Sequence, residues 1–159
     1  MKDVALILET NNLRGGNANR QTVLMSLERL LLHLKKQTLD INSLREIIIT
    51  HDDISLEEQT GIIRETKLSN LQFVKISTAD NYYQAKELGF RESKASIVVF
   101  ADSDCLPVDG WLEEILLPFE KDSAEVVSGR TTYDNSTFGI AATTIDFMYF
   151  GSVIPERLP

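Results

Sequence analysis

The chain has 159 residues, of which 43% are hydrophobic and 25% are charged, and its formal net charge is −8. This length and composition are typical of one globular domain with a buried core. The negative charge argues against nucleic acid as a partner, because the chain has no basic field to attract phosphates. A polyanionic substrate would need a metal ion or local basic residues to hold it.

In the first half of the chain, short apolar runs alternate with amphipathic stretches. The spacing of apolar residues and the positions of turn and capping residues predict five segments. These are a strand at 4–8, a loop at 13–19, a helix at 20–36, a strand at 44–50 and a helix that follows Ser55 and runs to about 67.

The second half continues the alternation. Asp80 is expected to cap a helix that contains Tyr82 and Tyr83, which we interpret as residues that pack this helix against the sheet. The predicted elements are strands at 71–77, 97–101 and 125–128 and helices at 80–92 and 109–121, followed by a polar irregular segment at 131–137 and a segment at 140–150 that fits a helix or a strand.

This order of elements predicts an α/β fold with a Rossmann-like, mostly parallel sheet and helices on both faces. Ligands of such sheets bind outside the carboxyl ends of the strands. Polar residues follow three of the predicted strands, at 9–12, 51–53 and 102–104. Neither a GxGxxG fingerprint nor a GxxxxGK[ST] loop follows the first strand, so a dinucleotide site and a P-loop are both disfavoured.

A buried strand at 97–101 leads directly into Asp102, Ser103 and Asp104. Carboxylates two positions apart on an extended chain project to the same side and repel each other unless a cation or water lies between them. Mg²⁺ and Mn²⁺ prefer such oxygen ligands. A solvated acidic loop is the alternative for this DxD pattern, which is common by chance.

The polar ends of these strands resemble three motifs of the inverting family-2 glycosyltransferases of the GT-A fold, in their N-terminal, nucleotide-sugar-binding half. The motifs occur in the family's order and near its spacings, and the likeness extends over almost the whole chain. They are the tail after the first strand, the acid that ends the second strand and the a-x-D-a-D pattern of the fourth, which here are Glu9-Thr10-Asn11, Asp52 and Phe100-Ala101-Asp102-Ser103-Asp104.

The resemblance implies a role for each matching residue. Asp104 would be the main metal ligand and Asp102 would assist it near the ribose, with Mn²⁺ or Mg²⁺ as the cofactor. The implied nucleotide contacts are Asp52 to the base, Glu9, Thr10 and Asn11 around base and ribose, and Lys86 near the diphosphate. Glu9 replaces the usual Pro or Thr and His51 replaces the usual first Asp, so the base stays open, with a UDP-sugar favoured.

The implied reaction is inverting transfer of a sugar from a nucleoside diphosphate to a hydroxyl acceptor, a carbohydrate or another alcohol. The family's acid pair that supplies the general base has no counterpart after Asp104, and Asp134 and Asp146 are only weak candidates. We therefore leave the catalytic base unassigned. We expect residues 1–159 to form a single nucleotide-sugar-binding domain, a fragment of a longer glycosyltransferase that is inactive alone.

Two other functions remain open. A sugar-nucleotide pyrophosphorylase shares this fold and substrate, and Arg14-Gly15-Gly16 faintly resembles its glycine-rich loop. A non-catalytic nucleotide-sugar-binding domain would keep the acids without a working acceptor site.

The cysteine content and hydropathy bear on the compartment. Cys105 is the only cysteine, so the sequence predicts neither a disulfide framework nor a zinc cluster. No apolar run reaches the roughly 18 residues of a membrane span. We expect a cytoplasmic protein, with placement of the full-length form at the inner face of the membrane as the alternative.

Overall fold

The computed structural model describes residues 3–10, 20–121, 124–133 and 136–143. The chain divides into two compact units, residues 1–114 and residues 115–159. The first unit contains the whole β-sheet and every described candidate site residue, and the second contains a short helix at 137–143.

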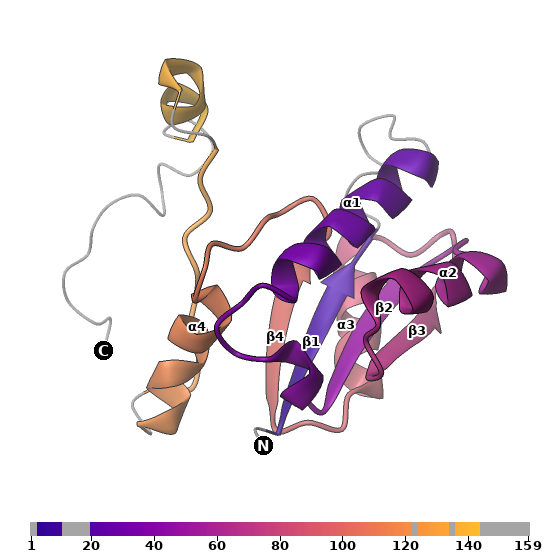
Figure 1. Cartoon of the computed structure of the whole chain (residues 1–159), viewed down its shortest axis with the longest axis horizontal. Coiled ribbons are helices and arrows are strands. Elements are labelled where there is room, and N and C mark those ends of the chain that lie inside the picture. The colour runs from indigo at the N-terminus through magenta and orange to yellow at the C-terminus, as the bar shows by residue number, and fades with distance from the viewer. Residues whose placement is uncertain (1–2, 11–19, 122–123, 134–135, 144–159) are drawn as a thin grey trace. The chain divides into compact units, whose positions relative to one another are not determined.

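The first unit is built on four parallel strands in the order β3-β2-β1-β4 (Figure 1). The strands are β1 (Val4–Glu9), β2 (Glu46–His51), β3 (Leu71–Lys75) and β4 (Ile97–Asp102). β1 pairs with β2 on one side and with β4 on the other. The chain thus steps outward from β1 to β3 and then returns to the opposite side of β1, which makes the β1–β4 boundary the topological switch point where ligands of such sheets bind.

Helices cover both faces of this sheet, as the sequence predicted. Figure 1 shows α1 (Arg20–Leu34) and α2 (Leu56–Thr66) in front of the strands and α3 (Tyr82–Glu92) behind them. A short 3-10 helix, η2 (Ile41–Ser43), precedes β2, and α4 (Trp111–Glu120) follows β4. Every residue of β1 and β2 is buried, which explains why the middle of each strand is a continuous apolar run instead of an alternating pattern.

The core of the first unit lies between the central strands and α1. Its side chains are aliphatic and come from the helical repeat of α1 and from consecutive positions of β1 and β2. The fully buried large residues include Leu6, Ile7, Leu8, Leu27, Leu30, Leu31, Leu34, Ile47, Ile48 and Ile49. This rigid centre fixes the carboxyl ends of β1 and β2 relative to each other.

Three of the predicted local features are wrong. Tyr83 does not pack α3 against the sheet, since it is 77% exposed. Residues 125–128 form no strand, and Val126 is 84% exposed. Two adjacent valines favour a strand only when a neighbouring strand accepts their backbone hydrogen bonds, and none pairs with them among the described residues. Asp80 does not cap α3, because its carboxylate accepts from the Ser77 N–H at 2.8 Å, and Asn81 is the N-cap.

The remaining predicted strands and helices are confirmed with ends that differ by a few residues. Of the segment at 140–150 that fitted a helix or a strand, residues 140–143 are helical and the others lie outside the described residues. Within the described ranges, every helix is too short or too polar to cross a membrane.

Candidate functional site

The carboxyl ends of β1, β2 and β4 bring the predicted site residues to one edge of the sheet. In the parallel register, Glu9 lies opposite Thr50 of β2 and opposite Asp102 of β4. Asp52 follows the last residue of β2 directly. Asn11, the remaining predicted residue of the first motif, lies outside the described residues.

At the β4 end, three side chains form one hydrogen-bonded cluster. The Lys86 ammonium lies 2.8 Å from Asp102 Oδ1. The Tyr82 hydroxyl donates to both oxygens of the Asp102 carboxylate, at 3.1 Å and 3.0 Å, and accepts from Lys86 Nζ. Lys86 Nζ also lies 4.1 Å from the centroid of the Tyr82 ring. Residues from the first two turns of α3 therefore hold the first aspartate of the DxD pattern.

The protonation states in this cluster follow from burial and charge. Burial, followed by the neighbouring Asp102 charge, raises the pKa of Tyr82 against the opposing effect of Lys86, so the phenol remains a donor at neutral pH. Burial alone would lower the pKa of Lys86, but its hydrogen bonds to Asp102 and Tyr82 raise the pKa above its ordinary value. The cluster at neutral pH thus holds an ammonium beside the carboxylate.

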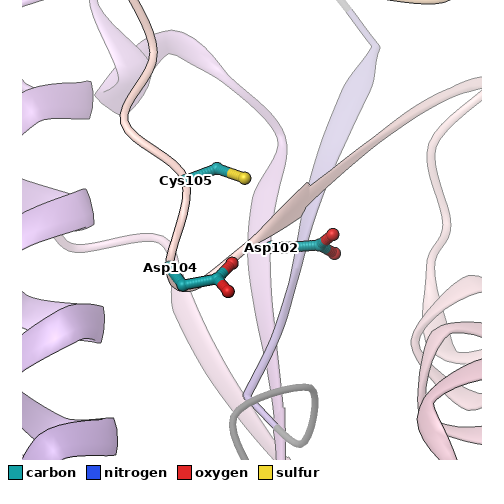
Figure 2. Close-up of side chains that lie close together, drawn as sticks. All are labelled: Asp102, Asp104 and Cys105. Atoms are coloured by element: carbon teal, nitrogen blue, oxygen red, sulfur yellow. The ribbon is translucent and has the colours of Figure 1, made fainter. Parts of the chain in front are cut away.

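The DxD pattern forms the one candidate metal-binding group found among the described residues. Ligand atoms of Asp102, Asp104 and Cys105 lie within 4.8 Å of one another, Asp102 at the end of β4 and the other two on the loop that follows (Figure 2). Burial, with Asp104 and Asp102 nearby, raises the pKa of the Cys105 thiol to about 11, so the usable donors at neutral pH are the two carboxylates. Two carboxylates fit a hard divalent cation such as Mg²⁺ or Mn²⁺.

The β1 end is more enclosed than its polar sequence predicts. Glu9 has no exposed surface, and Thr10 is buried with its hydroxyl donating to the Thr50 carbonyl at 2.8 Å. This hydrogen bond ties the tail of β1 to β2 where their ladder ends. The side chains of Glu9 and Thr10 are therefore buried at the carboxyl end of the sheet, where they support its surface without being exposed on it.

The β2 end is fixed by His51, which is buried. Its Nδ1 accepts from the Ile54 N–H at 3.0 Å, and burial lowers the pKa of the imidazole. A neutral ring is required for Nδ1 to act as an acceptor. His51 thus serves as the anchor of the turn after β2, and this turn sets the position of the adjacent Asp52, which is 4% exposed.

Sequence reasoning missed Tyr82 as a member of this cluster and assigned it to packing. A signal was present, since Tyr82 and Lys86 are four positions apart and lie on one face of a helix. The hydrogen bonds to Asp102 depend on how closely α3 approaches β4, and no pattern within a single segment encodes that distance.

Comparisons with known protein sequences identify a family and one similar curated protein. The sequence model of Glycosyl transferase family 2 matches residues 16–156, which is more than half of the chain. The chain is 26% identical over 101 residues to Glycosyltransferase AglE of Haloferax volcanii, a match that covers 62% of this chain and 33% of that protein. The chain thus spans about a third of the length of this curated relative.

Solved structures show the same fold. The crystal structure of S. aureus TarS matches with a TM-score of 0.63 at 16% identity, covering 86% of this chain and 22% of TarS. The structure of S. aureus TarS 1-349 matches with a TM-score of 0.55 at 14% identity, covering 84% of this chain and 40% of that one. At this identity the likeness concerns the fold, and it confirms the predicted GT-A class.

Proposed function

The chain belongs to glycosyl transferase family 2, and on that premise we propose that it binds a nucleoside-diphosphate sugar, with a UDP-sugar favoured, for inverting transfer to a hydroxyl acceptor. The observation that carries this proposal is the pair Asp102 and Asp104 at the switch point of the sheet. A diphosphate is a dianion or trianion, and a chain with net charge −8 binds it only where a local cation offsets the repulsion.

The proposed roles follow from where each side chain lies. Asp104, exposed on the loop, and Asp102, at the end of β4, would hold Mn²⁺ or Mg²⁺. Such an ion, when bound, supplies Lewis-acid stabilisation of the leaving nucleoside diphosphate. Lys86, whose ammonium lies beside Asp102, adds a positive charge next to the proposed metal site, where it would help to hold the diphosphate.

The remaining binding residues lie on the two neighbouring strands. Asp52 is proposed to contact the base from the end of β2, and Glu9, Thr10 and Asn11 to shape the base and ribose region from the end of β1. The buried position of Glu9 and Thr10 favours an indirect role, in which they set the shape of the edge.

The activity of the whole protein is a proposal too, since the chain spans only part of its relatives. The general base remains unassigned, and Asp134 and Asp146 lie outside the described residues. We retain the predictions that residues 1–159 are a nucleotide-sugar-binding fragment without transferase activity of its own and that the protein is cytoplasmic.

The test is calorimetry of UDP binding to the 159-residue chain in the presence of Mn²⁺, with Asp104→Asn as the variant. We expect this variant to lose at least about tenfold in affinity, since removing one carboxylate leaves the ion a single aspartate. Asp109→Asn is the matched control, because Asp109 is an exposed aspartate further along the same loop. Equal affinities for the parent and both variants would contradict the metal role.

Two activity assays address the alternatives. Binding without turnover by the full-length protein would favour the non-catalytic domain, and release of pyrophosphate from a nucleoside triphosphate and a sugar phosphate would favour the pyrophosphorylase. The residues that suggested the pyrophosphorylase, Arg14-Gly15-Gly16, lie outside the described residues.

A further inference from the structure

Tyr82 is the first residue of α3, and its hydroxyl lies between the two charged groups at the end of β4. It reaches both oxygens of the Asp102 carboxylate and also the Lys86 ammonium. We propose that Tyr82 is a positioning residue, which holds the Asp102 carboxylate in the orientation in which it receives the metal. This inference rests on the proposed function, because it concerns the same site.

The first turn of α3 holds the Tyr82 backbone in place. The Asn81 side chain accepts from the Tyr83 and Gln84 N–H groups at 2.9 Å and 3.0 Å, while the Gln84 side chain accepts from the Asn81 N–H at 2.8 Å. This reciprocal capping box satisfies donors that a helix start otherwise leaves unpaired. The start of α3 is therefore a fixed platform, from which the Tyr82 ring extends toward β4.

The Tyr82 ring has a further constraint from its neighbour. It meets the Tyr83 ring edge to face, with centroids 5.1 Å apart and planes at 82°. With the backbone capped and the ring packed, the direction of the hydroxyl is set. A donor with a fixed direction restricts the rotation of the Asp102 carboxylate, which a long and flexible lysine cannot do alone.

A purely packing role for Tyr82 makes a different prediction. Packing depends on the ring, which Tyr82→Phe keeps, together with its contact to the Lys86 ammonium at 4.1 Å. Only the hydroxyl is lost, and with it both hydrogen bonds to Asp102. A positioning role predicts that this single atom matters for metal-dependent binding, whereas a packing role predicts that it does not.

The experiment measures UDP affinity by calorimetry with and without Mn²⁺, for the parent, Tyr82→Phe and Tyr83→Phe, alongside the midpoint of thermal unfolding. Tyr83 is the matched control, because it is the adjacent tyrosine and is 77% exposed. We expect Tyr82→Phe to reduce the Mn²⁺-dependent gain in UDP affinity by about tenfold. We expect its affinity without Mn²⁺ to stay within about twofold of the parent and Tyr83→Phe to match the parent throughout.

Three results would overturn the inference. If Tyr82→Phe and Tyr83→Phe show the same Mn²⁺-dependent gain as the parent, Tyr82 has no positioning role while the proposed function stands. If Tyr82→Phe loses affinity equally with and without Mn²⁺ and its unfolding midpoint falls in parallel, its role is structural. If the parent itself shows no Mn²⁺-dependent UDP binding, the proposed function fails and this inference fails with it.

Discussion

Asp52 and Asp53 are adjacent aspartates at the end of β2, yet they have different surroundings. Asp52 is 4% exposed and follows the buried His51, whereas Asp53 is exposed. A carboxylate held at the mouth of the sheet is desolvated already, so a hydrogen bond from a ligand to Asp52 displaces little water. The same hydrogen bond to the exposed Asp53 would only replace one that its carboxylate already makes with water, so it would contribute little.

We therefore expect Asp52→Asn to weaken UDP binding by about 1–3 kcal/mol, the range for hydrogen bonds lost at a charged acceptor. Asp53→Asn, the matched control, should bind as the parent does. Calorimetry with UDP and with inorganic pyrophosphate separates the contacts, because only UDP carries a base. An equal loss for both ligands would place the role of Asp52 at the phosphates, contrary to the proposal.

For single residues, the sequence predicts which carboxylates lie at the ends of strands, because a polar residue after an apolar run indicates a strand end directly. It does not predict that Glu9 is fully enclosed or that Tyr82 reaches Asp102. Both properties depend on how elements from distant parts of the sequence approach one another. Periodicity within one segment carries no information on that approach.

Two glycines within helices have opposite environments. A Cβ built on Gly89 of α3 would lie 2.6 Å from Ile7 Cγ2 and 3.2 Å from Thr50 Cγ2, whereas one on Gly61 of α2 has nothing within 4 Å. Ile7 is fully buried and branched at Cβ, so it has few rotamers into which to move. Gly89 is therefore the residue that lets α3 approach β1 and β2 closely.

The two alanine substitutions should consequently change the free energy of unfolding in opposite directions. We expect Gly89→Ala to lower the free energy of unfolding by about 1–3 kcal/mol through overpacking. Gly61→Ala should raise it by about 0.5–1 kcal/mol, because alanine favours the helix more than glycine does and its Cβ would meet no other atom. Urea unfolding of the two variants measures both changes, and stabilisation by Gly89→Ala would show that α3 does not approach β1 so closely.

The start of α2 is held by Glu58, which combines a capping box with a link to α1. Its carboxylate accepts from Arg20 and, at 2.7 Å, from the Ser55 N–H, while the Ser55 hydroxyl accepts from the Glu58 N–H at 3.3 Å. The hydrogen bond from Arg20, followed by that from Ser55, lowers the pKa of Glu58 from its ordinary 4.5 to about 2.

Because the pKa of Glu58 is lowered in the folded state, the direction in which stability changes with pH is defined. Stability from Glu58 is fully present above its ordinary pKa of 4.5 and is lost as the pH falls toward about 2. We expect Glu58→Gln to be less stable than the parent by about 0.5–1 kcal/mol at pH 7. This difference should shrink between pH 4.5 and pH 2, as urea unfolding across the range would measure.

Glu57→Gln is the control for that series, because Glu57 is an exposed acid in the same first turn of α2. A difference between parent and Glu58→Gln that is constant with pH would mean that the lost interaction does not involve the charge of Glu58.

Helix starts illustrate what a sequence can and cannot predict about elements. The helix predicted to follow Ser55 is confirmed, and the structure shows Ser55 as its N-cap in a capping box with Glu58. Asp80 and Asn81 are adjacent and both are residue types that cap helices, so only the residue three positions later separates them. Asn81 is the cap because Gln84, not Tyr83, supplies the reciprocal side chain.

The negative charge of the whole molecule would make a bound cation decisive for the binding of a diphosphate ligand. With a net charge of −8, the chain repels an anion unless the Asp102–Asp104 pair is neutralised. We expect EDTA to lower UDP affinity at least about tenfold while leaving the weaker binding of uridine unchanged, because uridine lacks the diphosphate. Fluorescence or calorimetric titrations of the two ligands, with and without EDTA, measure this difference, and parallel losses would contradict it.

β4 can join the sheet only late in the synthesis of the chain, because Ser96 bonds to Asp3 across 93 positions. Until then β1 has an open edge, of the kind that recruits chaperones or a strand of another molecule. Such long-range closure is slow, so the end of β4, with Asp102, meets the end of β1 late in folding. A nucleotide that binds only the closed sheet would thus stabilise those newly made chains in which the last strand has docked.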